Sequence, residues 1–448
     1  MRYTPHTAAD QEHMLREIGV KSVEALYHHV PETLRLRAKI DLPSGLSEHG
    51  VRKRLAALAS ENAAAEDWSL FLGAGIYNHF IPSAVDAVIA RSEFATSYTP
   101  YQPEVSQGTL QALFEYQTLI CQLTGMEVSN AAVYDGASAA AEAVLMSRRI
   151  QPASRRRVLM SRSLHPHYRA VVRSYLSNLD GVRLEEIPFD STGATDINRL
   201  AEELDERSMC VVVGYPNFFG VVEDLRPIQA LCTKAGAQLI SATAEPLSLG
   251  LLKPPGEFGV DIAVGEGQSL GVPMNLGGPA FGFFACQKKS VRSMPGRLVG
   301  ETVDSEGRRG FVLTLATREQ HIRREKATSN ICTSQTLCAL GATVFMSLMG
   351  KSGMRRLAEI NVSRAHQAGA RLLQGAGLAK VFSGPYFNEF VLRAPNLKEL
   401  FAKCATEKII PGVSLEKWYP DLKDSLLVCV TEMNEKEEIE RLVRTISQ

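Results

Sequence analysis

Short apolar runs alternate with segments of helical periodicity through the large middle part of the chain. Three runs have the length and apolar content of buried strands: VVVGYP (211–216), QLIS (238–241) and FGFFAC (281–286). Residues 109–124 and 225–235 instead place apolar side chains at the spacing of one helix face. Strands that alternate with helices predict an α/β domain around a mainly parallel sheet, which we place at residues 66–345.

The two ends of the chain have different patterns. Residues 1–65 repeat apolar side chains at helical spacing, which predicts an N-terminal helical arm. These side chains are Met14, Leu15 and Ile18, and then Val51, Leu55 and Leu58. Residues 346–448 alternate predicted helices (356–374, 396–405, 435–446) with strand-like segments (387–393, 425–430). We expect a smaller C-terminal α/β domain there.

Composition excludes several classes of protein. Lysine plus arginine and aspartate plus glutamate both total 49 of 448 residues, so no net charge favours nucleic acid or an anionic membrane. The basic run at 155–157 is interpreted as solvated surface. Eight cysteines are scattered without a CxxC pair, and no histidine has metal-ligand spacing, so we expect reduced thiols and no metal. No stretch has the pattern of a signal peptide or a membrane span, and we expect a cytoplasmic protein.

A candidate phosphate-binding turn lies in the segment YDGASAAAEAVLMSRR (134–149). Gly136, Ala137 and Ser138 are small residues at a predicted helix start, where backbone N–H groups and the helix dipole favour an anion. The alternative is that Asp135 and Ser138 only cap the helix and that Gly136 makes the turn tight. The sequence leaves both open.

Residues 261–282 form a predicted strand, a polar turn and a glycine-rich hairpin. Enzymes of the aminotransferase-like fold carry at this place the lysine that forms an imine with pyridoxal phosphate (PLP). Gln268 and Ser269 stand there instead, and neither is an amine. The aspartate expected against the pyridine nitrogen is also missing, because the strand at 238–241 is followed by ATA and then Glu245. The covalent step of a PLP enzyme therefore cannot run from this position.

A displaced lysine is the alternative. The candidates are Lys253, Lys288, Lys289 and Lys326. Lys288 and Lys289 follow the hairpin strand as expected surface charges, and Lys253 lies in the proline-rich loop KPPGEFG.

Two polar loops are candidate binding segments. The first, SYTPYQPEVSQGTL (97–110), is rigid and aromatic, which suits substrate contact through Tyr98, Tyr101 and Gln102. The second, TREQHIRREKATSNICTSQ (317–335), is cationic and carries hydroxyl groups, which suits a phosphate or carboxylate. Its candidate residues are Arg323, Thr328, Ser329 and Asn330. The alternatives are a packed structural loop and surface ion pairs. His165 and His167 are expected to be hydrogen-bonded.

Long strings in the chain resemble one family. Residues 98–143, 265–286 and 317–333 closely resemble glycine dehydrogenase (decarboxylating), the P-protein of the glycine cleavage system, and in particular subunit 1, the alpha chain of its two-subunit form. The likeness extends from EHMLREIGVKSVEALYHHVPETLRL (12–36) into the small domain. The resemblance implies a PLP-dependent transferase-like fold, fold type I.

The resemblance also implies a partner that carries the cofactor. In the two-subunit form PLP is held on a lysine of the beta subunit, and alpha and beta form an alpha2-beta2 assembly. The implied reaction is decarboxylation of glycine and transfer of the aminomethyl group to the lipoyl arm of the H-protein.

This chain would then carry no catalytic lysine of its own. Thr328, Ser329, Asn330 and Arg323, with the loop at 98–102, are expected to reach the beta subunit's PLP site. Two other functions remain open from the sequence. One is a self-sufficient PLP decarboxylase or aminotransferase with a displaced lysine. The other is a non-enzymatic regulatory protein on a degenerate enzyme fold.

Overall fold

The computed structural model describes residues 5–35, 42–331, 334–375 and 377–447. The chain separates into two compact units, residues 1–62 and 63–448.

The first unit is helical. Helix α1 (Ala8–Ile18) begins at Thr7, which forms a capping box with Asp10, and ends at Gly19 in the left-handed region. Helix α2 (Glu48–Ala59) begins at Ser47, whose side chain accepts a hydrogen bond from the Gly50 amide. The helices predicted around Met14 and Leu55 are therefore present. None of the described residues of this unit is buried.

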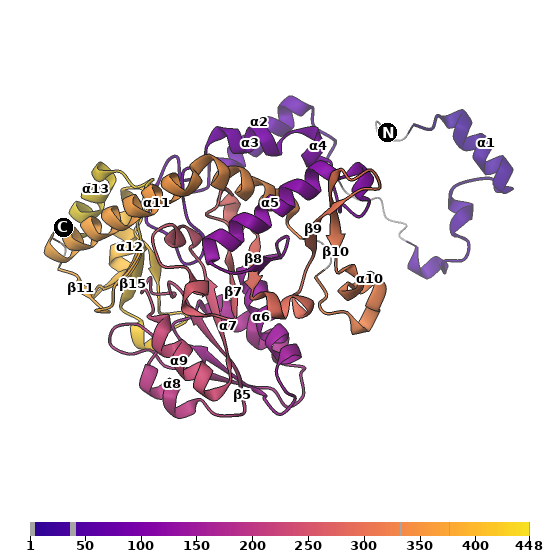
Figure 1. Ribbon diagram of the computed structural model, residues 1–448. Helices are drawn as coiled ribbons and strands as arrows, with labels where there is room; N and C mark the ends of the chain where they lie inside the picture. Colours follow the sequence, from indigo (N-terminus) through magenta and orange to yellow (C-terminus); the bar gives the residue numbers. More distant parts are fainter. Residues whose placement is uncertain (1–4, 36–41, 332–333, 376, 448) are drawn as a thin grey trace. The chain divides into compact units, whose positions relative to one another are not determined.

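A large sheet organises the second unit (Figure 1). Its seven described strands have the order β2-β8-β7-β6-β5-β3-β4. Strands β7, β6, β5, β3 and β4 are parallel, whereas β8 is antiparallel to both β7 and β2. The bounds are β2 (Val128–Ser129), β3 (Arg157–Ser161), β4 (Arg183–Ile187), β5 (Ser208–Gly214), β6 (Gln238–Thr243), β7 (Ile262–Glu266) and β8 (Gly282–Cys286). The apolar runs are buried strands, as predicted, and the mainly parallel α/β sheet is confirmed.

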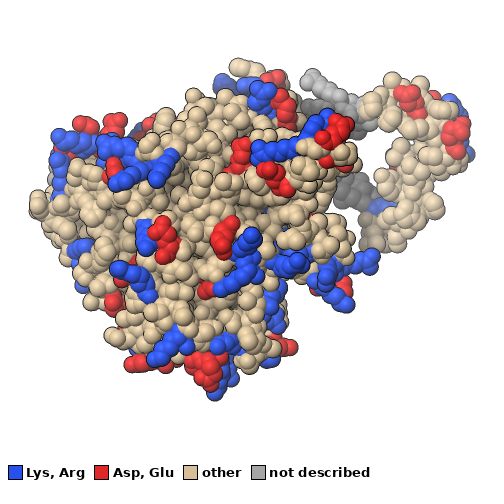
Figure 2. Space-filling view, viewed as in Figure 1, with Lys and Arg blue, Asp and Glu red and all other residues tan. Residues whose placement is uncertain are grey.

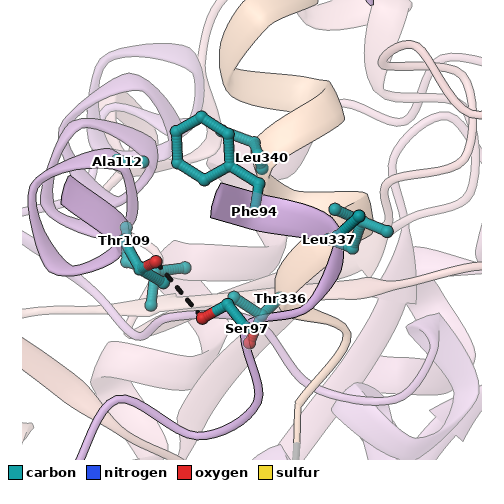
Figure 3. A pocket seen from close by; sticks show the side chains of 9 residues that line it. Phe94, Ser97, Thr109, Ala112, Thr336, Leu337 and Leu340 are labelled. Carbon is teal, nitrogen blue, oxygen red and sulfur yellow. Dashed lines mark hydrogen bonds between the residues drawn. The ribbon is translucent and has the colours of Figure 1, made fainter. Parts of the chain in front are cut away.

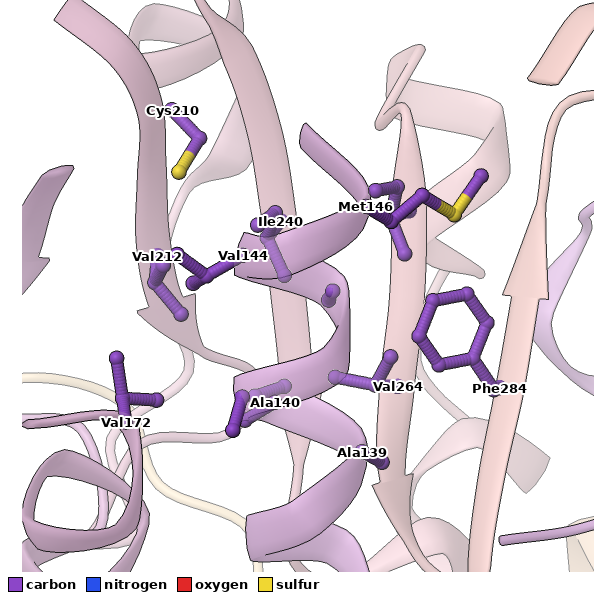
Figure 4. Close-up of a cluster of buried hydrophobic side chains, with 14 of the residues drawn as sticks. Ala139, Ala140, Val144, Met146, Val172, Cys210, Val212, Ile240, Val264 and Phe284 are labelled. Atoms are coloured by element: carbon purple, nitrogen blue, oxygen red, sulfur yellow. The ribbon is translucent and has the colours of Figure 1, made fainter. Parts of the chain in front are cut away.

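Helices connect and cover these strands. Their bounds are α3 (Ser83–Ile89), α4 (Ser92–Ala95), α5 (Gln107–Thr124), α6 (Gly136–Ile150), α7 (Pro166–Leu176), α8 (Ile197–Glu203) and α9 (Leu225–Ala235). Helix α6 lies against the sheet (Figure 4), and its alanines allow the close approach that a dense core requires. Its contacts in this core are Ala139, Ala140, Val144 and Met146 with Val172, Cys210, Val212, Ile240, Val264 and Phe284.

The C-terminal part has a sheet of its own. Four described strands pair antiparallel in the order β11-β12-β15-β14. Their bounds are β11 (Ala379–Lys380), β12 (Glu389–Arg393), β14 (Val413–Ser414) and β15 (Ser425–Cys429), and helices α12 (Leu397–Thr406) and α13 (Lys436–Ser447) accompany them. These elements match the predicted ones. The boundary expected at residue 345 falls inside α11 (Thr336–Gly375), and the division there stays a prediction.

The remaining described strands form two pairs. Strand β1 (Ser69–Leu70) is parallel to β13 (Ile409–Ile410), and β9 (Leu298–Val303) is antiparallel to β10 (Arg309–Thr314). The short helix α10 (Gln320–Arg323) follows β10.

Helix α11 corrects one expectation. By length and composition it is apolar enough to cross a bilayer, with a mean hydropathy of 1.3 over an 18-residue window. The sequence prediction that no segment is so apolar was wrong for this helix. Of that window, 44% is buried inside the protein, where α11 packs against α3 and α5, and a core helix passes the same test as a membrane span.

Candidate functional site

An open cavity of about 420 Å³ lies at the carboxyl ends of the parallel strands, the usual place for a ligand in an open α/β sheet. The start of α6, the start of α7 and the end of β7 all contribute to it. Its lining residues include Gly75, Tyr134, Asp135, Ala137, His165, His167, Tyr168, Glu266 and Gln335.

The N-terminus of α6 is occupied by carboxyl groups of this chain. Asp135 is the N-cap residue, and its Oδ1 accepts a hydrogen bond from the Ser138 amide at 2.7 Å. Glu266 Oε2 accepts one from the Gly136 amide at 3.0 Å. The capping interpretation of this turn therefore describes its hydrogen bonds. Glycine is required at 136, because an added Cβ would lie 2.0 Å from the Tyr168 hydroxyl oxygen.

Glu266 meets further amides on its other oxygen. Its Oε1 accepts hydrogen bonds from the amides of Gly267 (3.0 Å), Gln268 (3.2 Å) and Phe281 (3.2 Å). Burial raises the pKa of Glu266 to about 8, although the amide donors oppose the rise. One buried carboxyl group thus accepts four backbone N–H groups at the end of β7.

Gln268 and Ser269 are also engaged within the protein. Gln268 Oε1 accepts a hydrogen bond from the Tyr77 amide at 2.9 Å, and its Nε2 donates to the carbonyl oxygens of Tyr77 (3.1 Å) and Val272 (2.6 Å). Ser269 Oγ donates to Glu245 Oε2 at 3.1 Å. Both side chains are only 2% exposed.

A buried histidine links two carboxylates beside Ser269. His79 Nε2 lies 2.9 Å from Glu245 Oε2, and its Nδ1 lies 2.9 Å from Glu432 Oε2. Burial alone would lower the pKa of His79, but Glu245 and Glu432 together raise it to about 10. His79 is therefore a cation bound on both sides.

A third carboxyl group holds the same segment. Glu389 Oε1 accepts a hydrogen bond from the Ala74 amide at 2.6 Å, and its Oε2 accepts one from the Tyr77 hydroxyl at 2.9 Å. Burial raises the pKa of Glu389 to about 7. Residues 74–79 are thus fixed to both the large sheet and the C-terminal sheet.

His165 is neutral. Its Nε2 donates to the Ala74 carbonyl oxygen at 2.8 Å, and its Nδ1 accepts from the His167 amide at 3.1 Å, which together require one neutral tautomer. Burial lowers the pKa of His165 to about 4. Its hydrogen bonds agree with the interpretation of this residue as hydrogen-bonded.

Comparisons with known proteins place this geometry in a family. The family description "Glycine cleavage system P-protein" matches residues 1–446. The chain belongs to the glycine cleavage system P-protein family. A relative from Carboxydothermus hydrogenoformans, named probable glycine dehydrogenase (decarboxylating) subunit 1, is 47% identical over 446 residues, 100% of this chain and 99% of the relative. A relative of the same name from Anaeromyxobacter dehalogenans is 51% identical, covering 98% of each chain.

Solved structures agree with the family assignment. The crystal structure of a glycine decarboxylase (P-protein) of the glycine cleavage system, in inhibitor-bound form, matches with a TM-score of 0.91 and 45% identity over 100% of this chain and 99% of that one. A sphingosine-1-phosphate lyase from Burkholderia pseudomallei, 14% identical with a TM-score of 0.66, and a NifS-like protein, 12% identical with a TM-score of 0.64, share the fold. The expected fold type I architecture is confirmed.

The residues at the strand ends of this P-protein family member do not form a PLP-binding site. No lysine lines the cavity among the described residues. The amides of Gly136 and Ser138, which could hold a phosphate, already donate to Glu266 and Asp135.

The alternative lysines lie elsewhere. Lys253 and Lys289 are 51% and 69% exposed, 3.6 Å and 3.7 Å from Glu257 and Asp261. Lys288 and Lys326 also lie outside the lining of this cavity. Among the described residues, no group of three histidine, cysteine, aspartate or glutamate side chains could hold a metal ion.

The two polar loops meet each other away from this cavity. Tyr101 Oη accepts a hydrogen bond from Arg297 Nη2 at 2.8 Å, and the His321 ring centre lies 5.4 Å from the Tyr101 ring centre. Arg297 Nε in turn lies 3.5 Å from Glu319 Oε2. Tyr98 is 76% exposed. Gln102 is exposed just before the short turn that begins at Pro103.

A small cavity of about 80 Å³ lies beside the first loop (Figure 3). Phe94, Ala112, Leu337 and Leu340 make it apolar, and Ser97 Oγ lies 3.3 Å from Thr109 Oγ1 at its edge. It is too small for a substrate with a cofactor.

The cationic loop reaches a different part of the surface. Arg323 ends α10, in a region where Figure 2 shows lysine and arginine side chains close together. The Thr328 amide donates to the Arg318 carbonyl oxygen at 3.0 Å, and Ser329 Oγ accepts from the Ile331 amide at 3.1 Å. Thr328, Ser329 and the exposed Asn330 do not line the strand-end cavity; Gln335 is the described residue of this segment that does.

Sequence reasoning named Asp135 as a helix cap and Glu245 as the residue after the missing aspartate, but it did not connect Glu245 with His79 or identify the role of Glu266. His79 and Glu245 are 166 residues apart, so no local pattern connects them. Only Glu266 gave a signal: it is an acid at the end of an apolar strand, just before the glycine-rich turn.

Proposed function

We propose that this chain is the alpha subunit, subunit 1, of a glycine-cleaving P-protein. With a second subunit it decarboxylates glycine and passes the aminomethyl group to the lipoyl arm of the H-protein. Full-length similarity to relatives named subunit 1, together with Gln268 and Ser269 at the imine-forming position, carries this proposal. Neither alternative function has a comparable observation in its favour.

In this proposal PLP is held by the beta subunit. Support comes from the strand ends, where Glu266 accepts the Gly136 amide and where Ser269 and His79 both contact Glu245. We propose a cytoplasmic alpha2-beta2 assembly in which residues of both polar loops contact the partner's PLP site. These residues are Thr328, Ser329, Asn330 and Arg323, with Tyr98, Tyr101 and Gln102. The contact between Tyr101 and His321 supports it, because it joins the two loops on one surface.

The N-terminal unit, taken by itself, leaves many apolar side chains uncovered, and we propose that the partner subunit covers part of them. Among the described residues, eleven of the 24 exposed large hydrophobic side chains lie between Met14 and Leu58. At about 1.5–3 kcal/mol for each side chain removed from water, covering this set would stabilise an assembly substantially. Val51, Leu55 and Leu58 follow the i, i+4, i+7 spacing by which a helix docks into a groove.

Intact-mass measurement after borohydride reduction tests the assignment of PLP. Each purified subunit is incubated with PLP, reduced and weighed. We expect an unchanged mass for this chain and one added pyridoxyl group on the beta subunit, and carbon dioxide release from glycine only when both are mixed with lipoylated H-protein. Stoichiometric addition at one lysine of this chain would overturn the proposal and identify the displaced residue.

A pair of variants in α2 tests the partner contact. Leu55→Gln should weaken assembly with the beta subunit by about tenfold, as expected for one lost buried leucine. Lys53→Gln changes the opposite face of the same helix and should leave assembly unchanged. Sedimentation velocity measures both. Equal assembly of the two variants with the beta subunit would show that this face of α2 does not contribute to the interface.

A further inference from the structure

A second large cavity lies at the C-terminal end of α6. Its volume is about 500 Å³. Four arginines line it together with a single acidic residue and a threonine hydroxyl: Arg148, Arg149, Arg155, Arg156, Asp180 and Thr328. The cavity is therefore strongly cationic, in a chain whose total charge is balanced.

The arginines are oriented by backbone carbonyl groups rather than by carboxylates. Arg155 Nη1 and Nη2 donate to the carbonyl oxygens of Ser208 (2.7 Å) and Ala235 (2.9 Å). Arg156 Nε donates to the Ala153 carbonyl oxygen at 2.9 Å. These bonds fix the position of the guanidinium groups and leave their charge uncompensated.

Of the two arginines on α6, Arg149 follows this pattern and Arg148 does not. Arg149 Nη2 donates to the Ser293 carbonyl oxygen at 3.0 Å and lies 3.9 Å from Glu142 Oε2. Among the described residues, Glu142 is the single carboxylate within ion-pair distance of an arginine that lines the cavity. Asp180 lines the cavity but forms no ion pair with these arginines. Arg148 makes no hydrogen bond or ion pair with any described residue.

Neighbouring positive charge and burial both affect the pKa of Arg149. Burial and Arg318 lower the pKa of the Arg149 guanidinium, against the opposing effect of Glu142. Basic residues in the last turn of a helix are explained by the helix dipole. The dipole does not explain Arg155 and Arg156, which lie beyond the helix and face the same cavity.

Arg157, which follows Arg156 in the sequence, has the ordinary arrangement of an arginine paired with carboxylates. Arg157 ion-pairs with Glu185, Glu203 and Asp205, the last at 2.9 Å. Three consecutive arginines thus have different environments: the third is surrounded by carboxylates, whereas the first two line a cavity without one in contact.

We propose that this arginine cavity binds a phosphate-bearing small molecule. Guanidinium groups match phosphate oxygens with paired N–H donors. Arg149, Arg155 and Arg156, which backbone carbonyl groups hold in place, would lose little freedom on binding. The Thr328 hydroxyl, which makes no hydrogen bond to a described residue, supplies a further donor. The volume suits a ligand of mononucleotide size. Leu145, Leu179 and Val182 give it an apolar wall for the organic part of such a ligand.

Calorimetric titration of the full-length chain tests this proposal with inorganic phosphate, pyrophosphate and AMP as probes. We expect saturable binding that weakens with added salt, with AMP tighter than phosphate if the apolar wall is used. The double variant Arg148→Gln/Arg156→Gln should weaken binding by about tenfold or more, as expected when charge-assisted hydrogen bonds are lost. The matched control, Arg199→Gln/Arg226→Gln, removes the same charge from arginines that already pair with Glu202 and Asp224.

Each other outcome overturns the proposal. Absence of saturable binding of all three probes up to about 10 mM, about ten-thousandfold above a micromolar dissociation constant, would show that the cavity holds no small phosphate ligand. Equal weakening in the control variant would assign binding to overall charge. Binding of heparin without binding of AMP or phosphate would instead assign the arginines to a polyanionic macromolecule. Thermal unfolding of both double variants checks that each remains folded.

Discussion

The two ends of α6 meet opposite groups. At its N-terminus, where unsatisfied N–H groups and the dipole favour an anion, the chain supplies its own carboxyl groups, Asp135 and Glu266. At its C-terminus the dipole disfavours an anion, yet four arginines line an open cavity there: Arg148, Arg149, Arg155 and Arg156. The carboxylate within ion-pair distance of them among the described residues is Glu142, 3.9 Å from Arg149. The first end is satisfied internally, and the second is not.

Under the proposal that the beta subunit holds PLP, this difference teaches how a cofactor site can be lost without loss of the fold. A cofactor phosphate would satisfy the N–H groups at the helix start and in the β7 turn. Here the carboxyl group of Glu266 accepts the same kind of donors from Gly136, Gly267, Gln268 and Phe281. If PLP is held by the beta subunit, as proposed, the fold persists here because Glu266 supplies these four amides with an acceptor.

Removal of the Glu266 carboxyl group should give the largest effect. Glu266→Ala leaves the buried amides of Gly136, Gln268 and Phe281 without an acceptor, whereas the Gly267 amide also donates to the Phe281 carbonyl oxygen at 2.7 Å. The variant should lower the free energy of unfolding by about 3–5 kcal/mol. Glu266→Gln keeps one acceptor oxygen and should cost less. Urea unfolding followed by circular dichroism measures both losses.

Phosphate should stabilise the Glu266→Ala protein more than the protein that retains Glu266. Once Glu266 is removed, the helix start becomes an ordinary anion site, and phosphate at about ten times its dissociation constant adds about 1.4 kcal/mol to stability. This part of the measurement uses Glu266→Ala combined with Arg148→Gln/Arg156→Gln, so that the arginine cavity does not contribute. Equal stabilisation when Glu266 is retained would contradict the view that this carboxyl group fills the site.

The next largest effect is expected from added volume at the same helix end. In Gly136→Ala the new Cβ meets Tyr168 Oη at 2.0 Å and the Glu266 backbone nitrogen at 2.7 Å, and only the side chain can move. We expect a loss of about 3 kcal/mol in urea unfolding. Gly108→Ala in α5 is the control, since no atom lies within 4 Å of the added Cβ, and it should gain up to about 1 kcal/mol. Similar losses in both would show that the α6 turn has no special constraint.

The sequence predicted the sheet better than the site for a physical reason. Strands such as β5 and β6 are buried on both faces, so their apolar runs are visible locally. The missing lysine at Gln268 and Ser269 was visible too, because it is one position in a recognisable turn. The contact of His79 with Glu245 and Glu432 was not, because it depends on how distant segments pack.

The pH dependence of stability should sharpen the contrast between buried and exposed charge. The pKa of His79 is raised from 6.5 to about 10, so its contribution is fully present below pH 6.5 and is lost as pH rises towards 10. Native stability should fall relative to His79→Gln by at most about 1.4 kcal/mol per pH unit in that range. Urea unfolding at pH 6, 7.5 and 9 gives the curves, with His321→Gln, a side chain 45% exposed, as control. Parallel curves for the native protein and His79→Gln would contradict the ion-paired state.

The smallest expected effect lies in the arginine cavity. Arg148 has no partner among the described residues, so Arg148→Ala should change the free energy of unfolding by no more than about 0.5 kcal/mol without ligand. Arg157→Ala removes a guanidinium group, 16% exposed, that joins three carboxylates, and should cost about 1–2 kcal/mol. Urea unfolding in phosphate-free buffer separates the two. A cost at Arg148 equal to that at Arg157 would mean that Arg148 contributes to the folded structure, whereas a negligible cost leaves its charge available for a ligand.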